Sequence, residues 1–157
     1  MSEFASLPWD GVTGEIPPVD RLRTALQTRD LYVYCGHGDG GKYLPYKEVQ
    51  SLRHCSAALL MGCSSGALRS HGQLTPTGMA LAYLHARCPA LVANLWDVTD
   101  GDIDRFSVSL LRHCTREGGS LLVSLAKARG ACKLRFLTGS AAICYGVPLQ
   151  FQPQDGA

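Results

Sequence analysis

Short apolar runs recur along the chain and predict the strands of one sheet. They are LYVYC at 31–35, AALLMGC at 57–63, ALVANLW at 90–96 and AAICYGV at 141–147. Apolar residues at successive positions are typical of strands covered on both faces, as in parallel sheets. The pattern therefore predicts a mostly parallel sheet that is buried on both sides.

The segments between these runs have apolar residues at helical spacing, which predicts helices that cross over between parallel strands. The expected helices span 17–30, 45–55, 75–88, 99–114 and 120–130. Thr75 is expected to cap the third of them, with Pro76 in its first turn. Thr99 and Asp102 have the spacing of a capping-box pair at the start of the fourth. The result is an α/β layered fold with helices on both faces, formed as a single domain over residues 1–157.

Composition narrows the classes of function. The chain has 157 residues, 46% of them hydrophobic, and a formal net charge of +2 with scattered lysines and arginines, so no nucleic-acid partner is expected. Its apolar runs are far shorter than the roughly 20 residues of a membrane span, so no membrane association is expected either. The opening MSEFASLPWD lacks the apolar core of a signal peptide, and we expect an intracellular protein.

Cysteine usage argues against a disulfide framework and against a metal centre. The seven cysteines are an odd number and contain no C-x-x-C pair; they are Cys35, Cys55, Cys63, Cys88, Cys114, Cys132 and Cys144. Neighbouring cysteines and histidines also lack the four-ligand spacing of structural zinc sites. We expect no metal and no cofactor.

One histidine and one cysteine stand out because glycines flank both and both follow strands. His37 lies in CGHGDG and Cys63 in MGCSSG, and the carboxyl ends of parallel strands meet at one edge of a sheet. An imidazole near a thiol can activate it as a nucleophile, while the amides of Gly38 and Cys63 could bind an oxyanion. Taken singly, a strand-end cysteine is more often a small buried hydrophobe, and Gly-His-Gly a common turn. The conjunction favours a catalytic pair.

Acidic residues follow the third strand in WDVTDGDIDRF. Asp97, Asp100 and Asp104 are expected at the same sheet edge as the catalytic pair, with Asp100 and Asp104 on one face of a helix. A solvated helix start is the ordinary alternative, because acidic residues are favoured in a first helical turn.

Three motifs together resemble the catalytic domain of separase, the caspase-like cysteine endopeptidase that cleaves cohesin at anaphase. They are LYVYCGHGDG, LLMGCSSGAL and NLWDVTDGDIDRF, and the similarity extends over residues 11–149. The resemblance implies a caspase-like fold, His37 as general base, Cys63 as nucleophile, and an oxyanion hole from the amides of Gly38 and Cys63. It also implies cleavage after arginine, with Asp104 as the best match for the arginine-binding residue, Asp97 second, and Asp100 and Trp96 in the same substrate-binding set.

The resemblance also implies partners and a location. These are a cohesin kleisin subunit as substrate, a securin-type inhibitor, the upstream region of separase, and residence in cytoplasm and nucleus. We expect the domain to be short at its N-terminal side, lacking the family's first strand or strands. Two alternatives are another caspase-like protease of CHAT type and a non-enzymatic caspase-like interaction module.

Overall fold

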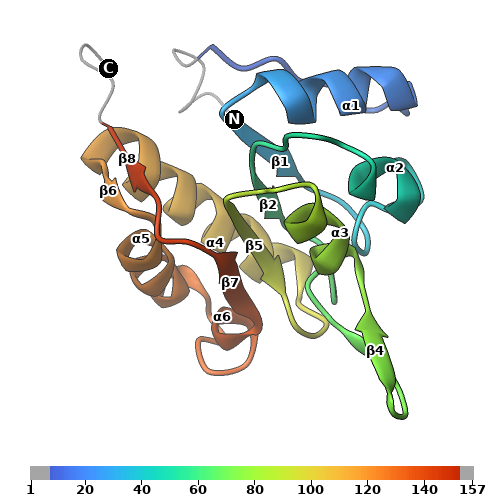
Figure 1. Cartoon of the computed structure of the whole chain (residues 1–157). Helices are drawn as coiled ribbons and strands as arrows, with labels where there is room; N and C mark the ends of the chain where they lie inside the picture. Colours follow the sequence, from blue (N-terminus) through green and yellow to red (C-terminus); the bar gives the residue numbers. More distant parts are fainter. Residues whose placement is uncertain (1–7, 153–157) are drawn as a thin grey trace.

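The computed structural model describes residues 8–152, and its centre is a four-stranded sheet in the order β1-β2-β5-β7 (Figure 1). The strands are β1 (Leu31–Tyr34), β2 (Ala57–Leu60), β5 (Ala90–Asn94) and β7 (Ala142–Gly146). The first three are parallel, whereas β7 runs antiparallel to β5 because α6 (Thr138–Ala141) delivers the chain to the carboxyl end of β5, where Ala142 lies opposite Asn94. The four predicted strands and the mostly parallel sheet are confirmed.

Helices cover both faces of this sheet (Figure 1). They are α1 (Val19–Thr28), α2 (Tyr46–Gln50) and α3 (Met79–His85) against one face, and α4 (Asp100–Arg112) and α5 (Leu121–Ala128) against the other. Side chains alternate along each strand, so Leu91 packs with the first group while its neighbour Val92 packs with the second. Both are fully buried, which explains why these strands appear in the sequence as continuous apolar runs.

Shorter elements complete the described chain. A π-helical turn (His113–Glu117) extends α4, a 3₁₀ turn (Arg129–Ala131) follows α5, and β6 (Gly119–Ser120) pairs antiparallel with β8 (Gln150–Phe151). None of the helices in residues 8–152 combines the length and the apolar character needed to cross a membrane.

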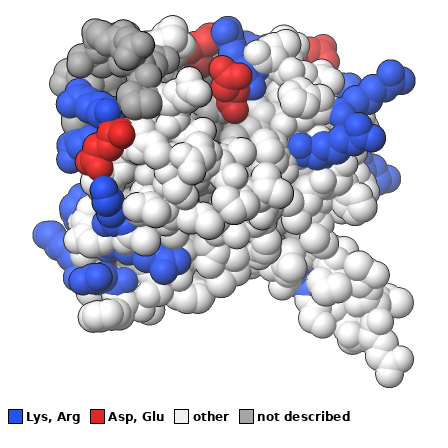
Figure 2. Space-filling view, turned by 60° about the vertical axis from the view of Figure 1, so that its left-hand side comes forward, with Lys and Arg blue, Asp and Glu red and all other residues white. Residues whose placement is uncertain are grey.

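The predicted start of the third helix is wrong. Helix α3 begins at Met79, and Thr75 and Pro76 lie instead in β4 (Leu74–Thr77), which pairs antiparallel with β3 (Arg69–His71). This hairpin projects from the body of the molecule as an arm, and the residues of both its strands are exposed (Figures 1 and 2). Proline is accommodated there because each strand of an exposed two-stranded ribbon has a partner on one side only. On the other side no strand requires a hydrogen bond from a backbone amide.

The predicted capping box of the fourth helix is also wrong. Thr99 is the residue before α4 but its side chain makes no capping hydrogen bond; its carbonyl accepts from the Asp102 and Ile103 amides. The Asp102 side chain is buried and accepts hydrogen bonds from the backbone amides of Lys133 (2.7 Å) and Leu134 (3.1 Å). Its carboxylate therefore fastens a distant loop to α4 instead of closing the helix start.

Candidate active site

The loops that follow β1 and β2 lie against each other at one edge of the sheet. A Cβ added to Gly62 would lie 1.9 Å from the carbonyl oxygen of Gly38 and 2.6 Å from that of Gly36. Only glycine at position 62 permits this approach, which brings the loop carrying His37 beside the loop carrying Cys63. The Tyr34 hydroxyl also donates a hydrogen bond to the His37 carbonyl at 2.8 Å, which holds the first loop in its turn.

A single cavity of about 350 Å³ connects these two loops with α4. The residues that line it are Cys35, Gly36, His37, Met61, Gly62, Cys63, Val98, Asp100, Ile103, Asp104 and Ser107. His37 is exposed and Cys63 is partly buried, so a ligand in the cavity has access to both. The structure thus brings together His37, Cys63, Asp100 and Asp104, which the sequence placed at a common sheet edge.

The Cys63 thiol is held by the segment that leads into α4. Its Sγ donates to the Val98 carbonyl at 3.2 Å, and the Val98 amide lies 3.5 Å from the same sulfur as a donor. In the described part of the chain, the hydrogen bonds of this thiol are with Val98 and not with the His37 ring. These contacts with the Val98 backbone fix the sulfur at the side of the cavity that leads into α4.

Two carboxylates give part of the cavity lining a negative charge. Asp100 and Asp104 lie one turn apart on α4, both exposed and both in the cavity lining. The Asp104 charge acts on a thiol in the same cavity: desolvation of the Cys35 sulfur by neighbouring atoms, and then the Asp104 carboxylate, raise the pKa of Cys35 above its usual value. A cavity with a nucleophile at one side and carboxylates at the other suits a cationic substrate side chain.

Other residues predicted for the site lie outside the cavity lining. Asp97 accepts a 2.6 Å hydrogen bond from the Ser64 hydroxyl, so its carboxylate fixes the loop after Cys63. The Trp96 indole donates to the Leu137 carbonyl at 3.1 Å. Gly38 has a φ of +66°, which glycine adopts readily. Its predicted oxyanion role, like the substrate contacts of Trp96 and Asp97, stays a prediction.

The sequence did not assign Cys35 or Ser107 to the site, yet both line the cavity. Cys35 directly follows β1, two residues before His37, and this position is the feature of the sequence from which its place in the cavity could have been predicted. Ser107 lies one turn beyond Ile103 on the buried side of α4, and its hydroxyl donates to the Ile103 carbonyl at 2.7 Å. Within residues 8–152, no three His, Cys, Asp or Glu side chains converge as metal ligands.

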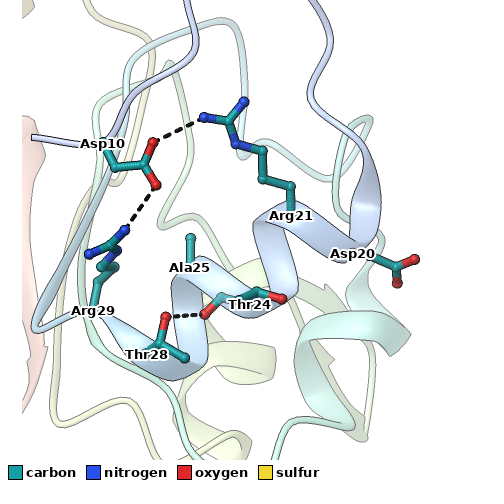
Figure 3. A pocket seen from close by; sticks show the side chains of 7 residues that line it. All are labelled: Asp10, Asp20, Arg21, Thr24, Ala25, Thr28 and Arg29. Carbon is teal, nitrogen blue, oxygen red and sulfur yellow. Dashed lines mark hydrogen bonds and ion pairs between the residues drawn. The ribbon is translucent and has the colours of Figure 1, made fainter.

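A second cavity, of about 280 Å³, lies on α1 (Figure 3). Arg21 and Arg29 each contact one oxygen of Asp10 at 3.0 Å, and the Arg21 hydrogen bond, followed by that of Arg29, lowers the pKa of Asp10. These two ion pairs hold the segment around Asp10 against α1. The lining of this second cavity contains no cysteine and no histidine, and we assign the chemistry of the molecule to the cavity around Cys63.

A parallel α/β sheet with a thiol and an imidazole at the ends of neighbouring strands defines the class of caspase-like cysteine protease domains. The family model described as "Separin, protease domain" matches residues 1–103. Separin of Mus musculus is 44% identical over 146 residues, which cover 92% of this chain, and separin of Saccharomyces cerevisiae is 43% identical over 149 residues, which cover 89%. The chain belongs to the separin protease-domain family.

A solved structure supports the same assignment. The crystal structure of the Saccharomyces cerevisiae separase–securin complex at 2.6 Å resolution has a TM-score of 0.81 and 41% identity to this chain. The match covers 87% of this chain and 10% of that one. The chain likewise spans only 7% of the mouse relative and 9% of the yeast relative. The likeness therefore concerns the protease domain, including its caspase-like fold.

Proposed function

We propose that this chain contains the catalytic site of a separase-type cysteine endopeptidase that cleaves after arginine in a cohesin kleisin subunit. The observation that carries the proposal is the single cavity lined by His37, Cys63, Asp100 and Asp104. It supplies a nucleophile, a base and two carboxylates within reach of one bound peptide. The membership of the family supports the same activity.

The chemistry follows from the groups in the cavity. Cys63 Sγ attacks the scissile carbonyl carbon, and His37 accepts the thiol proton and then gives it to the departing amine. The amides of Gly38 and Cys63 stabilise the oxyanion that develops during the attack. A water molecule, deprotonated by His37, then cleaves the thioester and releases the second product with Cys63 restored.

The carboxylates determine which residue precedes the cleaved bond. A guanidinium is a planar cation that pairs well with carboxylates, and Asp104 with Asp100 presents two of them along one side of α4. Asp104 is therefore the proposed arginine receptor. The solved neighbours are complexes of separase with securin, which supports a securin-type protein as the inhibitor of this site. The kleisin substrate, contact with the upstream separase region, and action in cytoplasm and nucleus belong to the same proposal.

The direct test is covalent labelling of the chain by a peptide acyloxymethyl ketone that ends in arginine. We expect mass spectrometry to place the label on Cys63 and on none of the other six cysteines. The variants Cys63→Ser and His37→Ala should both lose labelling. Labelling that persists in Cys63→Ser and moves to Cys35 or Cys55 would show that the nucleophile is misassigned.

A peptide comparison separates this function from the alternatives. A kleisin-derived peptide with a single arginine should be cut after that arginine, and its Arg→Glu counterpart should remain intact. A chain that accepts the covalent probe but cuts neither peptide would be a caspase-like protease with another substrate. A chain that neither accepts the probe nor cuts either peptide would be an interaction module.

A further inference from the structure

The cavity that contains Cys63 also contains a second thiol, that of Cys35, which the proposed reaction does not use. Both cysteines are free, and both can be reached from solvent: Cys35 is exposed and Cys63 is partly buried. Cys55, Cys88, Cys114 and Cys132 are buried, and Cys144, which is partly buried, is outside the lining of this cavity.

The topology of the sheet brings the two thiols to the same cavity. Strands β1 and β2 are adjacent and parallel, with Tyr34 opposite Leu60, and the Met61 amide donates to the Tyr34 carbonyl at 2.8 Å. Cys35 therefore follows β1 at the level of Met61, which lies two residues before Cys63. All three line the cavity that α4 closes.

Glycines give the two loops the freedom to close the remaining gap. Gly36 follows Cys35 and Gly62 precedes Cys63, and the backbones of the two loops already touch at Gly62. Since each cysteine is next to a glycine, small changes in backbone torsion can move one sulfur toward the other.

We propose that Cys35 and Cys63 form a reversible disulfide when a hydroperoxide enters the cavity. The Cys63 thiolate attacks the peroxide oxygen, the O–O bond breaks, and Cys63 becomes a sulfenic acid while hydroxide or alkoxide leaves. The Cys35 thiol then attacks the sulfenic sulfur, and the S–O bond breaks with loss of water. In total two thiols are oxidised, one hydroperoxide is reduced to water and an alcohol or second water, and no other reactant is needed.

The surroundings of the two sulfurs assign the order of attack. Cys63 lines the cavity together with His37, the proposed base, and the Val98 amide lies 3.5 Å from its sulfur as a donor. Desolvation of the Cys35 sulfur by neighbouring atoms, and then the Asp104 charge, raise the pKa of Cys35, which keeps it in its less nucleophilic thiol form. Cys63 is thus oxidised first and Cys35 resolves the sulfenic acid. The consequence for activity rests on the proposed function: the disulfide occupies the nucleophile and protects it from irreversible oxidation.

The test is peroxide oxidation of the purified chain, followed by alkylation of the remaining thiols and peptide mapping without reduction. Trypsin releases Cys35 in residues 30–42 and Cys63 in residues 54–69, a peptide that also contains Cys55. We expect these two peptides to be joined, with fragment ions that place the bridge at Cys63. Dithiothreitol should separate them and restore two alkylatable thiols.

The variants Cys35→Ala and Cys35→Ser provide matched controls, and either suffices if the other fails to fold. In both, Cys63 should advance under peroxide to sulfinic and sulfonic acid, which dithiothreitol does not reverse. The proposal is overturned if wild-type Cys63 advances in the same way while Cys35 remains alkylatable, or if the bridge from Cys35 ends at Cys55. Because the readout is a peptide mass, a disulfide found in a chain that never accepts the arginine probe would refute the proposed protease function and leave this inference standing.

Discussion

Asp104 is the residue on which the proposed arginine specificity depends. It lines the cavity with Cys63, one turn after Asp100, and is exposed. Replacement by asparagine removes the charge while keeping the size, so a charge-assisted hydrogen bond of about 1.5–3 kcal/mol is lost. We expect Asp104→Asn to lower the specificity constant for arginine peptides by about ten- to a hundredfold, measured with a fluorogenic arginine substrate.

The controls for this variant separate the pocket from the fold. Alkylation of Cys63 by iodoacetamide, a small uncharged reagent, should be unchanged in Asp104→Asn. Asp97→Asn removes a carboxylate outside the cavity lining and should have a smaller effect on arginine cleavage. Loss of iodoacetamide reactivity would mean that the substitution damages the fold, and an intact specificity constant would exclude Asp104 as the receptor.

Gly62 is the residue that allows the two catalytic loops to meet. In Gly62→Ala the new Cβ would lie 1.9 Å from the Gly38 carbonyl oxygen, a backbone atom that cannot move aside without shifting the loop after β1. We expect a loss of stability of about 1–3 kcal/mol from this overpacking, seen in urea denaturation, together with loss of labelling at Cys63. His37 and Cys63 would then be held too far apart.

Gly130→Ala is the matched control, because a Cβ at Gly130 would meet no atom within 4 Å. It should leave both the urea midpoint and the Cys63 labelling close to wild type. If Gly62→Ala behaves like Gly130→Ala, the two loops are looser than the contact at Gly62 requires, and their packing does not position the catalytic pair.

Asp102 joins two parts of the fold, helix α4 and the loop before α6. Burial opposes its charge, but hydrogen bonds from Arg105 and from the amides of Lys133 and Leu134 prevail and lower its pKa to about 2. A carboxyl whose pKa is lower in the folded state stabilises the fold above its unfolded pKa of 3.8. That stabilisation is lost as pH falls from about 4 toward 2.

We therefore expect Asp102→Asn to lower the melting temperature at neutral pH and to reduce its dependence on pH. The melting temperature of the wild type should fall more steeply than that of the variant as pH decreases from about 4 toward 2. Differential scanning calorimetry of both proteins across this range measures the difference. Asp10 and Glu117 also have lowered pKa values but are retained in both proteins, so their contribution cancels. Parallel curves would show that the Asp102 carboxylate does not support the loop.

The elements that the sequence predicted are those whose pattern is local. Leu91 and Val92 face opposite sides of a covered sheet, so an apolar run was sufficient to predict β5. The β3–β4 hairpin was missed because Thr75 and Pro76 together have the pattern of a helix start, and nothing apolar in the hairpin faces a core. An exposed hairpin has no burial pattern from which it could be predicted.

The residues of the candidate active site also divide into those that a local pattern predicts and those that depend on distant parts of the chain. The positions of His37 and Cys63 followed from glycines and strand ends, which are visible within a few residues of sequence. The role of Asp102 depends on amides more than 30 positions later, so a capping box was the nearest local explanation. The place of Cys35 in the same cavity as Cys63 depends on the packing of three elements, so no local pattern in the sequence predicts it.

The order of the strands leaves β1 at one edge of the central sheet. The carbonyls of Asp30, just before β1, and of Tyr34, at its end, accept hydrogen bonds from the Ala57 and Met61 amides, so these two residues face β2. In a parallel ladder the backbone groups of successive residues point to alternate sides, so Tyr32 also faces β2 while Leu31 and Val33 face the other way, and the Val33 amide is directed away from the sheet. Such an edge is able to pair with a further strand, which is how we propose that the upstream separase region would contact this domain.

Hydrogen exchange followed by mass spectrometry or NMR tests the openness of this edge. We expect the Val33 amide to exchange far faster than the amide of Val92, which lies in β5 between two paired strands. Adding the segment that precedes the matched region in the mouse relative should slow exchange at Val33 and leave Val92 unchanged, because a new strand can protect only the outer side of β1. Equal and slow exchange at both residues, independent of protein concentration, would mean that β1 is already covered and that the upstream region must contact another face.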